Sequence, residues 1–310
     1  MRILFAGTPE IAVLSLRALV EHGHQVAVLT NPDTPSGRGA KLTASPIADA
    51  AAKLGLTTYK PEILDQTVRG QLSGTCDLLV SFAFGKIFGP KFLALFPQGG
   101  LNVHPSLLPR WRGPSPLTAA ILARDSKTGI SIQKLALAMD TGDVLLQDER
   151  GLDGSETTGS LTLWAAEAAV TLLIETIEKI SKGQSVGLPQ DETQATYCRL
   201  IEKADGLLHW DLSALELDAA IRAYDPWPGA YTLWRGEKIR IKDSAVVPGN
   251  TGQLPGVVVS VDKSKGILIQ TKEGQLAIRQ LQLPSRKYLD FRSFLNGNPH
   301  LLGSRLGDFS

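Results

Sequence analysis

The sequence predicts an α/β fold in which a Rossmann-like parallel sheet forms a first domain and a small OB-like β-barrel follows it. The first 150 residues alternate short apolar runs with longer helical patterns, as β-α-β units do. After about residue 206 the pattern changes to short β-rich runs with glycine-containing turns. The chain has 310 residues, 43% of them hydrophobic, which is enough for two separate cores.

The first domain is expected to contain six strands and to close with a long helix. Pro9 can stand at the start of the first helix, which ends near Gly23. Residues 157–182 form the longest helical pattern, without proline and followed by Gly183. The expected strands are Arg2–Phe5, Gln25–Thr30, Asp77–Phe84, Gly100–His104, Gly129–Leu135 and Asp143–Gln147.

The second domain is expected to follow a linker. Residues 1–189 would form the first domain, residues 190–206 the linker, which is rich in Gln and Thr, and residues 207–310 the barrel. Trp227 and Trp234 are expected in its core rather than as stacking platforms for bases. One helix is expected at Leu215–Tyr224, and strands at Tyr231–Trp234, Lys238–Ile241, Gly256–Val261, Ile267–Thr271 and Gln275–Leu281.

Composition narrows the class of protein. A net charge of +1 argues against a highly basic nucleic-acid protein but leaves room for a locally basic face. Cys76 and Cys198 have no spacing that indicates a disulfide framework or a metal site. The apolar stretch Met1–Gly7 is too short for a signal sequence, and we find no run of the roughly 18 apolar residues that a membrane span needs. We therefore expect a soluble cytoplasmic protein without a membrane partner.

Polar residues at the end of one predicted strand indicate a reactive site. Asn102 and His104 are two residues apart and so share a face of the strand, which Pro105 ends. Ligands bind at the carboxyl ends of the strands in open α/β sheets. Further on, the turn at 139–143 presents Asp140. An Asn, a His and an Asp without a Ser or Cys nucleophile suit direct acyl transfer to an amine, because Asn and His can stabilise an oxyanion. The Asp can hold the His protonated or accept the amine proton.

Other interpretations of these residues exist. A lone Asn-x-His at a strand end is often a satisfied polar pair, and Asp140 can be a turn-former that bonds its own backbone. Gly7 follows the first strand, as in dinucleotide-dependent oxidoreductases, but no G-x-G-x-x-G occurs there.

The run from Asn102 to Pro109 with Arg110-Trp111-Arg112-Gly113, and then Met139-Asp140-Thr141-Gly142-Asp143, resembles the signature of folate-dependent formyltransferases. The resemblance implies 10-formyltetrahydrofolate as formyl donor, no metal, and a catalytic trio of Asn102, His104 and Asp140. It assigns folate contacts to Ser106, Leu107, Leu108 and Pro109 and to the strand end with Phe84 and Gly85. Many relatives have Tyr where this chain has Phe84, so only backbone contacts are expected there.

The loop from Asn31 to Leu42 and the opening Phe5–Glu10 resemble the branch of that family that acts on methionyl-tRNA. There the loop touches the tRNA acceptor stem, and Arg38 and Lys41 would contact phosphates; a solvated basic loop is the alternative. The resemblance extends over nearly the whole chain. It implies formyl transfer to initiator methionyl-tRNA. The alternatives are an amino-sugar nucleotide as acceptor, hydrolysis of formyltetrahydrofolate, and an RNA-binding module with an inactive transferase domain.

Overall fold

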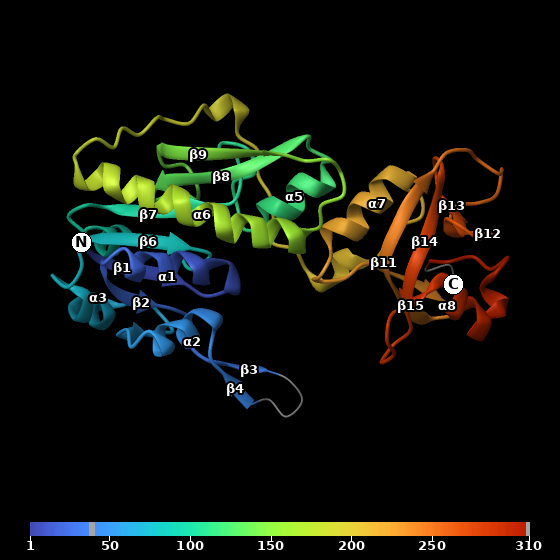
Figure 1. Cartoon of the computed structure of the whole chain (residues 1–310), viewed down its shortest axis with the longest axis horizontal. Coiled ribbons are helices and arrows are strands. Elements are labelled where there is room, and N and C mark those ends of the chain that lie inside the picture. Colours follow the sequence, from blue (N-terminus) through green and yellow to red (C-terminus); the bar gives the residue numbers. More distant parts are fainter. Residues whose placement is uncertain (37–40, 308–310) are drawn as a thin grey trace. The chain divides into compact units, whose positions relative to one another are not determined.

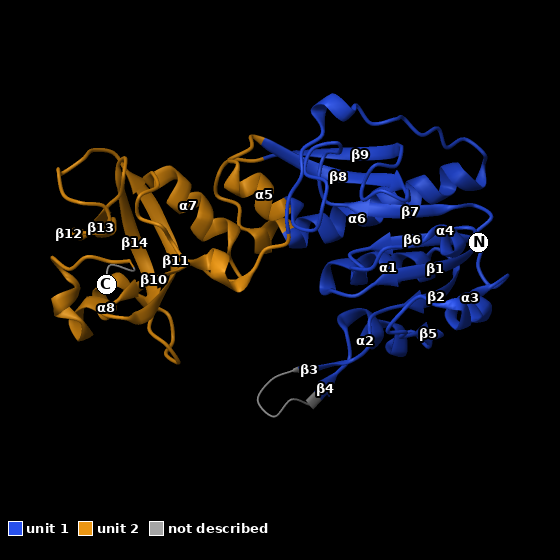
Figure 2. Ribbon diagram, turned by 180° about the vertical axis from the view of Figure 1, so that it is seen from behind, with its two compact units in different colours: residues 1–116, 127–151, 162–199 blue, residues 117–126, 152–161, 200–310 orange. Residues whose placement is uncertain are grey.

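The computed structural model describes residues 1–36 and 41–307, which form two compact units (Figure 2). Unit 1 comprises Met1–Pro116, Lys127–Gly151 and Thr162–Arg199, and unit 2 comprises Leu117–Ser126, Leu152–Leu161 and Leu200–Ser310. The main change of unit therefore falls after residue 199, inside the stretch 190–206. Residues 190–199 belong to unit 1 and contact its interior, so this half of the expected linker is part of a folded body.

Unit 1 is built on a seven-stranded sheet, in which all six expected strands are found (Figure 1). In spatial order the strands are β5 (Thr58–Tyr59), β2 (Gln25–Leu29), β1 (Arg2–Gly7), β6 (Leu78–Phe82), β7 (Gly100–His104), β8 (Lys127–Lys134) and β9 (Val144–Gly151). The first five are parallel, as expected of a Rossmann-like sheet. Strand β8 runs in the opposite direction and pairs antiparallel with both β7 and β9. Hydrophobic periodicity did not predict this reversal, because it indicates strands and not their direction.

The central strands are buried on both faces. Residues 3–6 of β1 have no exposed surface, and all five residues of β6 are buried. Continuous apolar runs of this kind are typical of strands that helices cover on both sides. The helices of this part of the chain are η1 (Glu10–Ala12), α1 (Val13–Glu21), α2 (Pro46–Lys53), α3 (Gln66–Leu72), α4 (Pro90–Leu93) and α6 (Thr158–Ser181), and α5 (Pro116–Leu122) lies almost wholly in unit 2.

Helix α6 has 24 residues and is long and apolar enough to cross a membrane by length and composition, contrary to our expectation. Its side chains nonetheless follow the pattern of a core helix. Leu161, Ala165, Ala169, Leu173 and Ile177, each four residues from the next, are all buried. This spacing places one apolar face against a protein interior. The core helices of soluble proteins can have the same length and apolar composition.

The loop expected to contact tRNA emerges after β2. Its flanks pair as the antiparallel strands β3 (Thr34–Ser36) and β4 (Lys41–Thr43), with Thr34 opposite Thr43. Arg38 lies outside the described residues, and of Lys41 only the backbone is described.

Unit 2 contains a six-stranded antiparallel sheet that curls into a half-barrel. Four antiparallel pairings give the strand order β10 (Tyr231–Trp234), β11 (Glu237–Val247), β14 (Gln275–Gln282), β13 (Gly266–Gln270) and β12 (Val258–Asp262), and β15 (Leu289–Asp290) pairs with β14. Four more helical segments are η2 (Glu192–Gln194), which lies in unit 1, η3 (Lys203–Gly206), α8 (Phe291–Gly297) and η4 (Pro299–Leu301).

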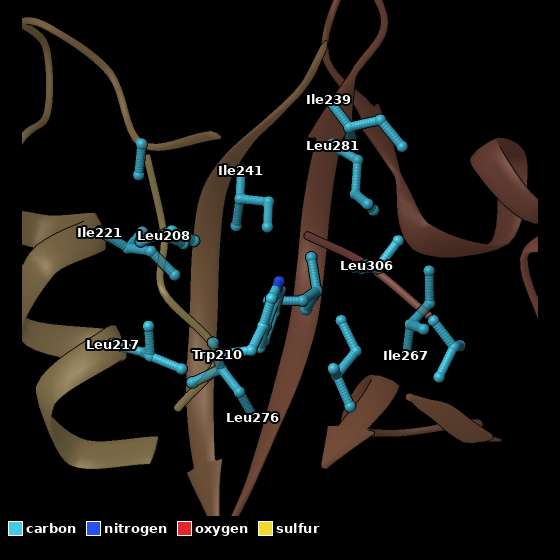
Figure 3. Packing of buried hydrophobic residues seen from close by; sticks show 14 of the residues in the cluster. Leu208, Trp210, Leu217, Ile221, Ile239, Ile241, Ile267, Leu276, Leu281 and Leu306 are labelled. Carbon is cyan, nitrogen blue, oxygen red and sulfur yellow. The ribbon is translucent and has the colours of Figure 1, made fainter. Parts of the chain in front are cut away.

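Helix α7 (Ala214–Ala223) begins with a capping box between Ser213 and Glu216 and packs on this sheet. Figure 3 shows Leu217 on α7, Ile241 on β11 and Leu276 on β14 around Trp210. Trp234 is buried, as expected. Trp227, expected in the core, is half exposed, because an apolar residue type does not decide its own burial.

Candidate active site

Strand β7 carries Asn102 and His104 toward its carboxyl end on one face. Asn102 lies opposite Ser81 of the parallel neighbour β6 and opposite Gln133 of the antiparallel neighbour β8. Strand pairing on both sides fixes this backbone. His104 is buried and Asn102 half-buried, so the two side chains border the protein interior rather than bulk solvent.

The turn between β8 and β9 carries Asp140. The backbone of Asp140 is left-handed, with φ 56°, a conformation that non-glycine residues adopt rarely and that recurs at functional sites. Gly142 is required two residues later, because a Cβ there would overlap the carbonyl oxygen of Lys134. The turn therefore has little freedom to place its carboxylate elsewhere.

The Asp140 carboxylate is the common partner of the polar groups at this site. Oδ1 accepts hydrogen bonds from Nδ2 of Asn102 at 3.1 Å and from Nε2 of Gln133 at 2.9 Å. Oδ2 accepts from the backbone N–H of Gly113 at 2.8 Å and lies 3.6 Å from Nδ1 of His104. The three residues predicted as the catalytic trio thus converge. Donors from a side chain on β7, a side chain on β8 and the backbone of Gly113 thus fix the direction of the carboxylate.

Both ring nitrogens of His104 face acceptors. Nδ1 faces the Asp140 carboxylate, and Nε2 lies 2.9 Å from the carbonyl oxygen of Trp111. These two contacts fix the plane of the imidazole ring and direct Nδ1 at the carboxylate.

Hydrogen bonds from buried hydroxyl groups hold the loop after β7, which is predicted to bind folate. Oγ of Ser106 donates to the carbonyl of Arg110 at 2.6 Å, and Oγ of Ser131 donates to the carbonyl of Ser106 at 2.6 Å. The backbone N–H of Leu108 donates to Ser131 at 3.1 Å. Ser106 and Leu108 are buried, while Leu107 and Pro109 are partly exposed. Within this segment, Leu107 and Pro109 therefore present the side-chain surface.

The other segment predicted to bind folate, at the end of β6, also contains one buried and one exposed residue. The Phe84 ring is buried and stacks on Phe88 with centroids 5.4 Å apart, and the Phe84 carbonyl accepts from Nδ2 of Asn31 at 3.0 Å. Gly85 is exposed with φ 80°. The Phe84 side chain thus packs in the core, and Gly85 is the accessible residue.

Sequence reasoning missed four polar residues at this site. They are Arg112 and Gln133, both buried, and Gln190 and Glu192, from the stretch interpreted as linker. The contacts of Arg112, Gln190 and Glu192 span about 50 to 80 positions along the chain, and no local pattern indicates such pairings. The contact between Gln133 and Asp140 spans seven positions. Of the four, only Arg112 lies in a motif that the sequence analysis singled out, Arg110-Trp111-Arg112-Gly113.

Two electrostatic features accompany these contacts. Hydrogen bonds to Glu192 raise the pKa of the Arg112 guanidinium, and the same bonds lower the pKa of the Glu192 carboxyl. Burial raises the pKa of the Cys198 thiol, whose sulfur accepts from the Ser115 N–H at 3.3 Å. Cys198 is therefore a packing thiol at this site rather than a thiolate nucleophile. Across residues 1–36 and 41–307 no group of three or more His, Cys, Asp or Glu side chains could hold a metal ion.

Known proteins resemble this chain over nearly its whole length. Methionyl-tRNA formyltransferase of Treponema denticola is 43% identical over 97% of this chain and 98% of its own. The protein of that name from Borrelia turicatae is 40% identical over 98% of this chain and 99% of its own.

Solved structures show the same fold. An N-formyltransferase from Helicobacter canadensis, in complex with folinic acid and dTDP-3-aminofucose, aligns with TM-score 0.67 and 18% identity over 89% of this chain and 97% of its own. HypX of Aquifex aeolicus, in complex with tetrahydrofolic acid, aligns with TM-score 0.63 and 19% identity over 95% of this chain and 47% of its own.

Family models agree with these relatives. The model described as formyl transferase matches residues 1–177, and the model of the formyl transferase C-terminal domain matches residues 200–299. The first alone covers more than half of the chain and includes Asn102, His104 and Asp140. The chain therefore belongs to the formyl transferase family.

Proposed function

We propose that this enzyme transfers a formyl group from 10-formyltetrahydrofolate to the α-amino group of methionine on initiator tRNA, for translation initiation. The observation that carries the proposal is the convergence of Asn102 and His104 on the Asp140 carboxylate. The named relatives, matched from end to end, supply the acceptor. Initiation takes place where charged tRNA and ribosomes are, so the proposed location is the cytoplasm.

The site residues stabilise charge during an acyl transfer. Folate supplies the formyl group; the amine nitrogen bonds to the formyl carbon, and the bond from that carbon to folate N10 breaks. The formyl oxygen becomes negative as the amine adds. Asn102 keeps a second amide N–H beside the one bound to Asp140 and can donate it to this oxygen. His104 can donate from Nε2 when the formyl oxygen replaces the Trp111 carbonyl as its partner, while Nδ1 stays directed at Asp140. The proton lost by the amine leaves with folate N10. Preorganised donors of this kind contribute most to such reactions.

We place the folate against the loop after β7 and the end of β6. Leu107, Pro109 and Gly85 offer exposed surface there, and Ser106 and Leu108 support the loop from inside. Structures of the same fold contain folate derivatives, which supports this placement. The reaction needs no metal in this scheme, because the donor already carries an activated formyl group.

We assign tRNA contacts to Arg38 and Lys41 and to an OB-like second domain, residues 207–310. A pocket of about 340 Å³ in unit 2 supports an anionic partner: Lys238 and Arg240 line it together with Gln282, Leu283, Pro284 and Ser285. The two cations are two residues apart on β11 and so share a face. Burial and the charge of Arg240 lower the pKa of Lys238. RNA phosphates would relieve this repulsion.

The deciding experiment offers the purified chain 10-formyltetrahydrofolate with four acceptors: charged initiator tRNA, free methionine, an amino-sugar nucleotide and water alone. We expect formylation of the charged tRNA at a kcat/KM at least 100-fold above that of free methionine, unchanged by a chelator. Comparable formylation of free methionine would remove the tRNA assignment. Formylation of the sugar nucleotide, or release of formate, would establish one of the two alternatives.

A further inference from the structure

Gln190, in the segment between α6 and unit 2, uses both ends of its side-chain amide at the active site. Its Nε2 donates to the carbonyl oxygens of Asp140 at 2.8 Å and Gly142 at 2.7 Å. Its Oε1 accepts from Nε and Nη2 of Arg112 at 3.1 and 2.9 Å. One side chain thus ties the turn that carries the carboxylate to the loop that follows β7.

Arg112 is itself fixed. It has no exposed surface, and Glu192 accepts from its Nη1 and Nη2 at 2.8 and 2.7 Å, a two-point contact that sets the plane of the guanidinium. The backbone of Arg112 also pairs with this segment, donating to the carbonyl of Thr196 at 2.9 Å and accepting from the N–H of Cys198 at 2.8 Å. A charge buried in this way is stable only with these partners in place.

Gln190 and the backbone that follows Arg112 both contact Asp140. Gln190 holds the backbone of Asp140, which stands in a left-handed conformation with φ 56°. Arg112 precedes Gly113, whose N–H donates to the Asp140 carboxylate at 2.8 Å. The direction of that carboxylate, and with it the orientation of the Asn102 amide, therefore depends on Gln190 and Arg112.

We propose that Gln190 is a positioning residue for formyl transfer: held by Arg112 and Glu192, it fixes the Asp140 turn so that the carboxylate aligns Asn102 and His104. The inference rests on the proposed function for its kinetic test. It assigns a catalytic consequence to residues that touch no substrate, in a segment that composition marks as linker.

Gln190→Glu tests the proposal because it changes the donor end of the side-chain amide and keeps the acceptor end. The variant keeps an acceptor for Arg112 but replaces the donor with an oxygen that faces two carbonyls. We expect kcat to fall about 10- to 100-fold, while KM for folate stays within about twofold and the melting temperature stays near that of wild type. Gln190→Met, which removes both ends at similar volume, should lose at least as much. Gln194→Ala, an exposed glutamine of the same segment, is the matched control and should behave as wild type.

A double variant distinguishes positioning from general support of the fold. If Gln190 acts through Asp140, adding Gln190→Glu to Asp140→Asn lowers kcat little further, whereas independent losses would multiply and overturn the proposal. Wild-type kcat in Gln190→Glu would also overturn it. A readout without substrate is the pair of ¹⁵N ring signals of His104, which should shift in Gln190→Glu and not in Gln194→Ala. An inactive wild type would refute the proposed function instead, and the His104 signals would still test the positioning.

Discussion

The amide nitrogen of Asn102 lies 3.1 Å from Oδ1 of Asp140, although 38 positions separate the two residues along the chain. One comes from a central strand of the sheet and the other from the turn between its last two strands. The contact fixes which end of the Asn102 side chain faces the carboxylate and holds its amide in one rotamer. The orientation of the Asn102 amide therefore depends on how well this turn is held.

Asn102→Ala and His104→Ala are each expected to lower kcat by about 10²- to 10³-fold while folate still binds. The reason is that each side chain donates to charge that develops only in the transition state. Single-turnover formylation and folate binding by fluorescence quenching separate the two effects. Loss of folate binding with an unaltered rate constant would contradict the assignment.

Asp140→Asn should lower kcat by a similar factor and change the pH–rate profile, because an amide cannot stabilise an imidazolium. Asp143→Asn is the matched control: this carboxylate lies three residues away, is partly exposed and pairs with Lys134 at 2.9 Å. We expect that control to keep near wild-type rates. An active Asp140→Asn enzyme with the wild-type profile would exclude the carboxylate from catalysis.

Gly142→Ala should destabilise the fold by about 1–3 kcal/mol and reduce activity, since the new methyl group meets the Lys134 carbonyl and forces the turn to move. Urea unfolding measures the free energy. Gly151→Ala, in the same pair of strands, has open space around its Cβ and should change stability by less than about 0.5 kcal/mol. Equal effects of the two substitutions would show that the turn is not constrained.

Glu192→Gln should lower the melting temperature at pH 7 but not at acid pH. Hydrogen bonds from Arg112 lower the pKa of the Glu192 carboxyl. Such a group adds stability at pH values above its unfolded pKa, about 4.3, and this stability is lost as the pH falls through the lower pKa of the folded state. Melting curves of both proteins should therefore converge below about pH 4.3. Glu149→Gln, which breaks the surface pair with Lys127, should have little effect at either pH. A difference that persists in acid would rule out the ion pair as its origin.

Replacing Arg38, Lys41, Lys238 or Arg240 by Ala should raise KM for tRNA and reduce the salt dependence of tRNA binding, each lost phosphate contact removing about one released counterion. Folate affinity should not change. Lys179→Ala, which removes a helix ion pair with Glu175, controls for net charge. Normal tRNA kinetics of the Arg38 and Lys41 variants across a salt series would leave that segment a solvated loop.

Short stretches of neighbouring residues determine much of the secondary structure. Each of the eleven expected strands has a counterpart in the structure, and helices α6 and α7 lie within a few residues of their expected positions, because hydrophobic period, glycine and proline act over neighbouring residues. The short strands β3, β4, β5 and β15 were not predicted, and β11 extends beyond its expected end. The shared face of Asn102 and His104 follows from the two-residue repeat of a strand. The turn at Asp140 follows from its glycine-containing sequence.

Long-range pairing decided the rest. No local pattern in the sequence indicates the reversed direction of β8, the burial of Arg112 or the exposure of Trp227. Gln190 belongs to a stretch whose composition resembles a linker, yet it holds the Asp140 turn through hydrogen bonds that cross about 50 positions of the chain. The sequence alone determined which residues we propose for the chemistry. Only the tertiary structure decided which residues hold them in place, because a buried charge or amide is stabilised by partners that the fold, and not the neighbouring sequence, brings within hydrogen-bonding distance.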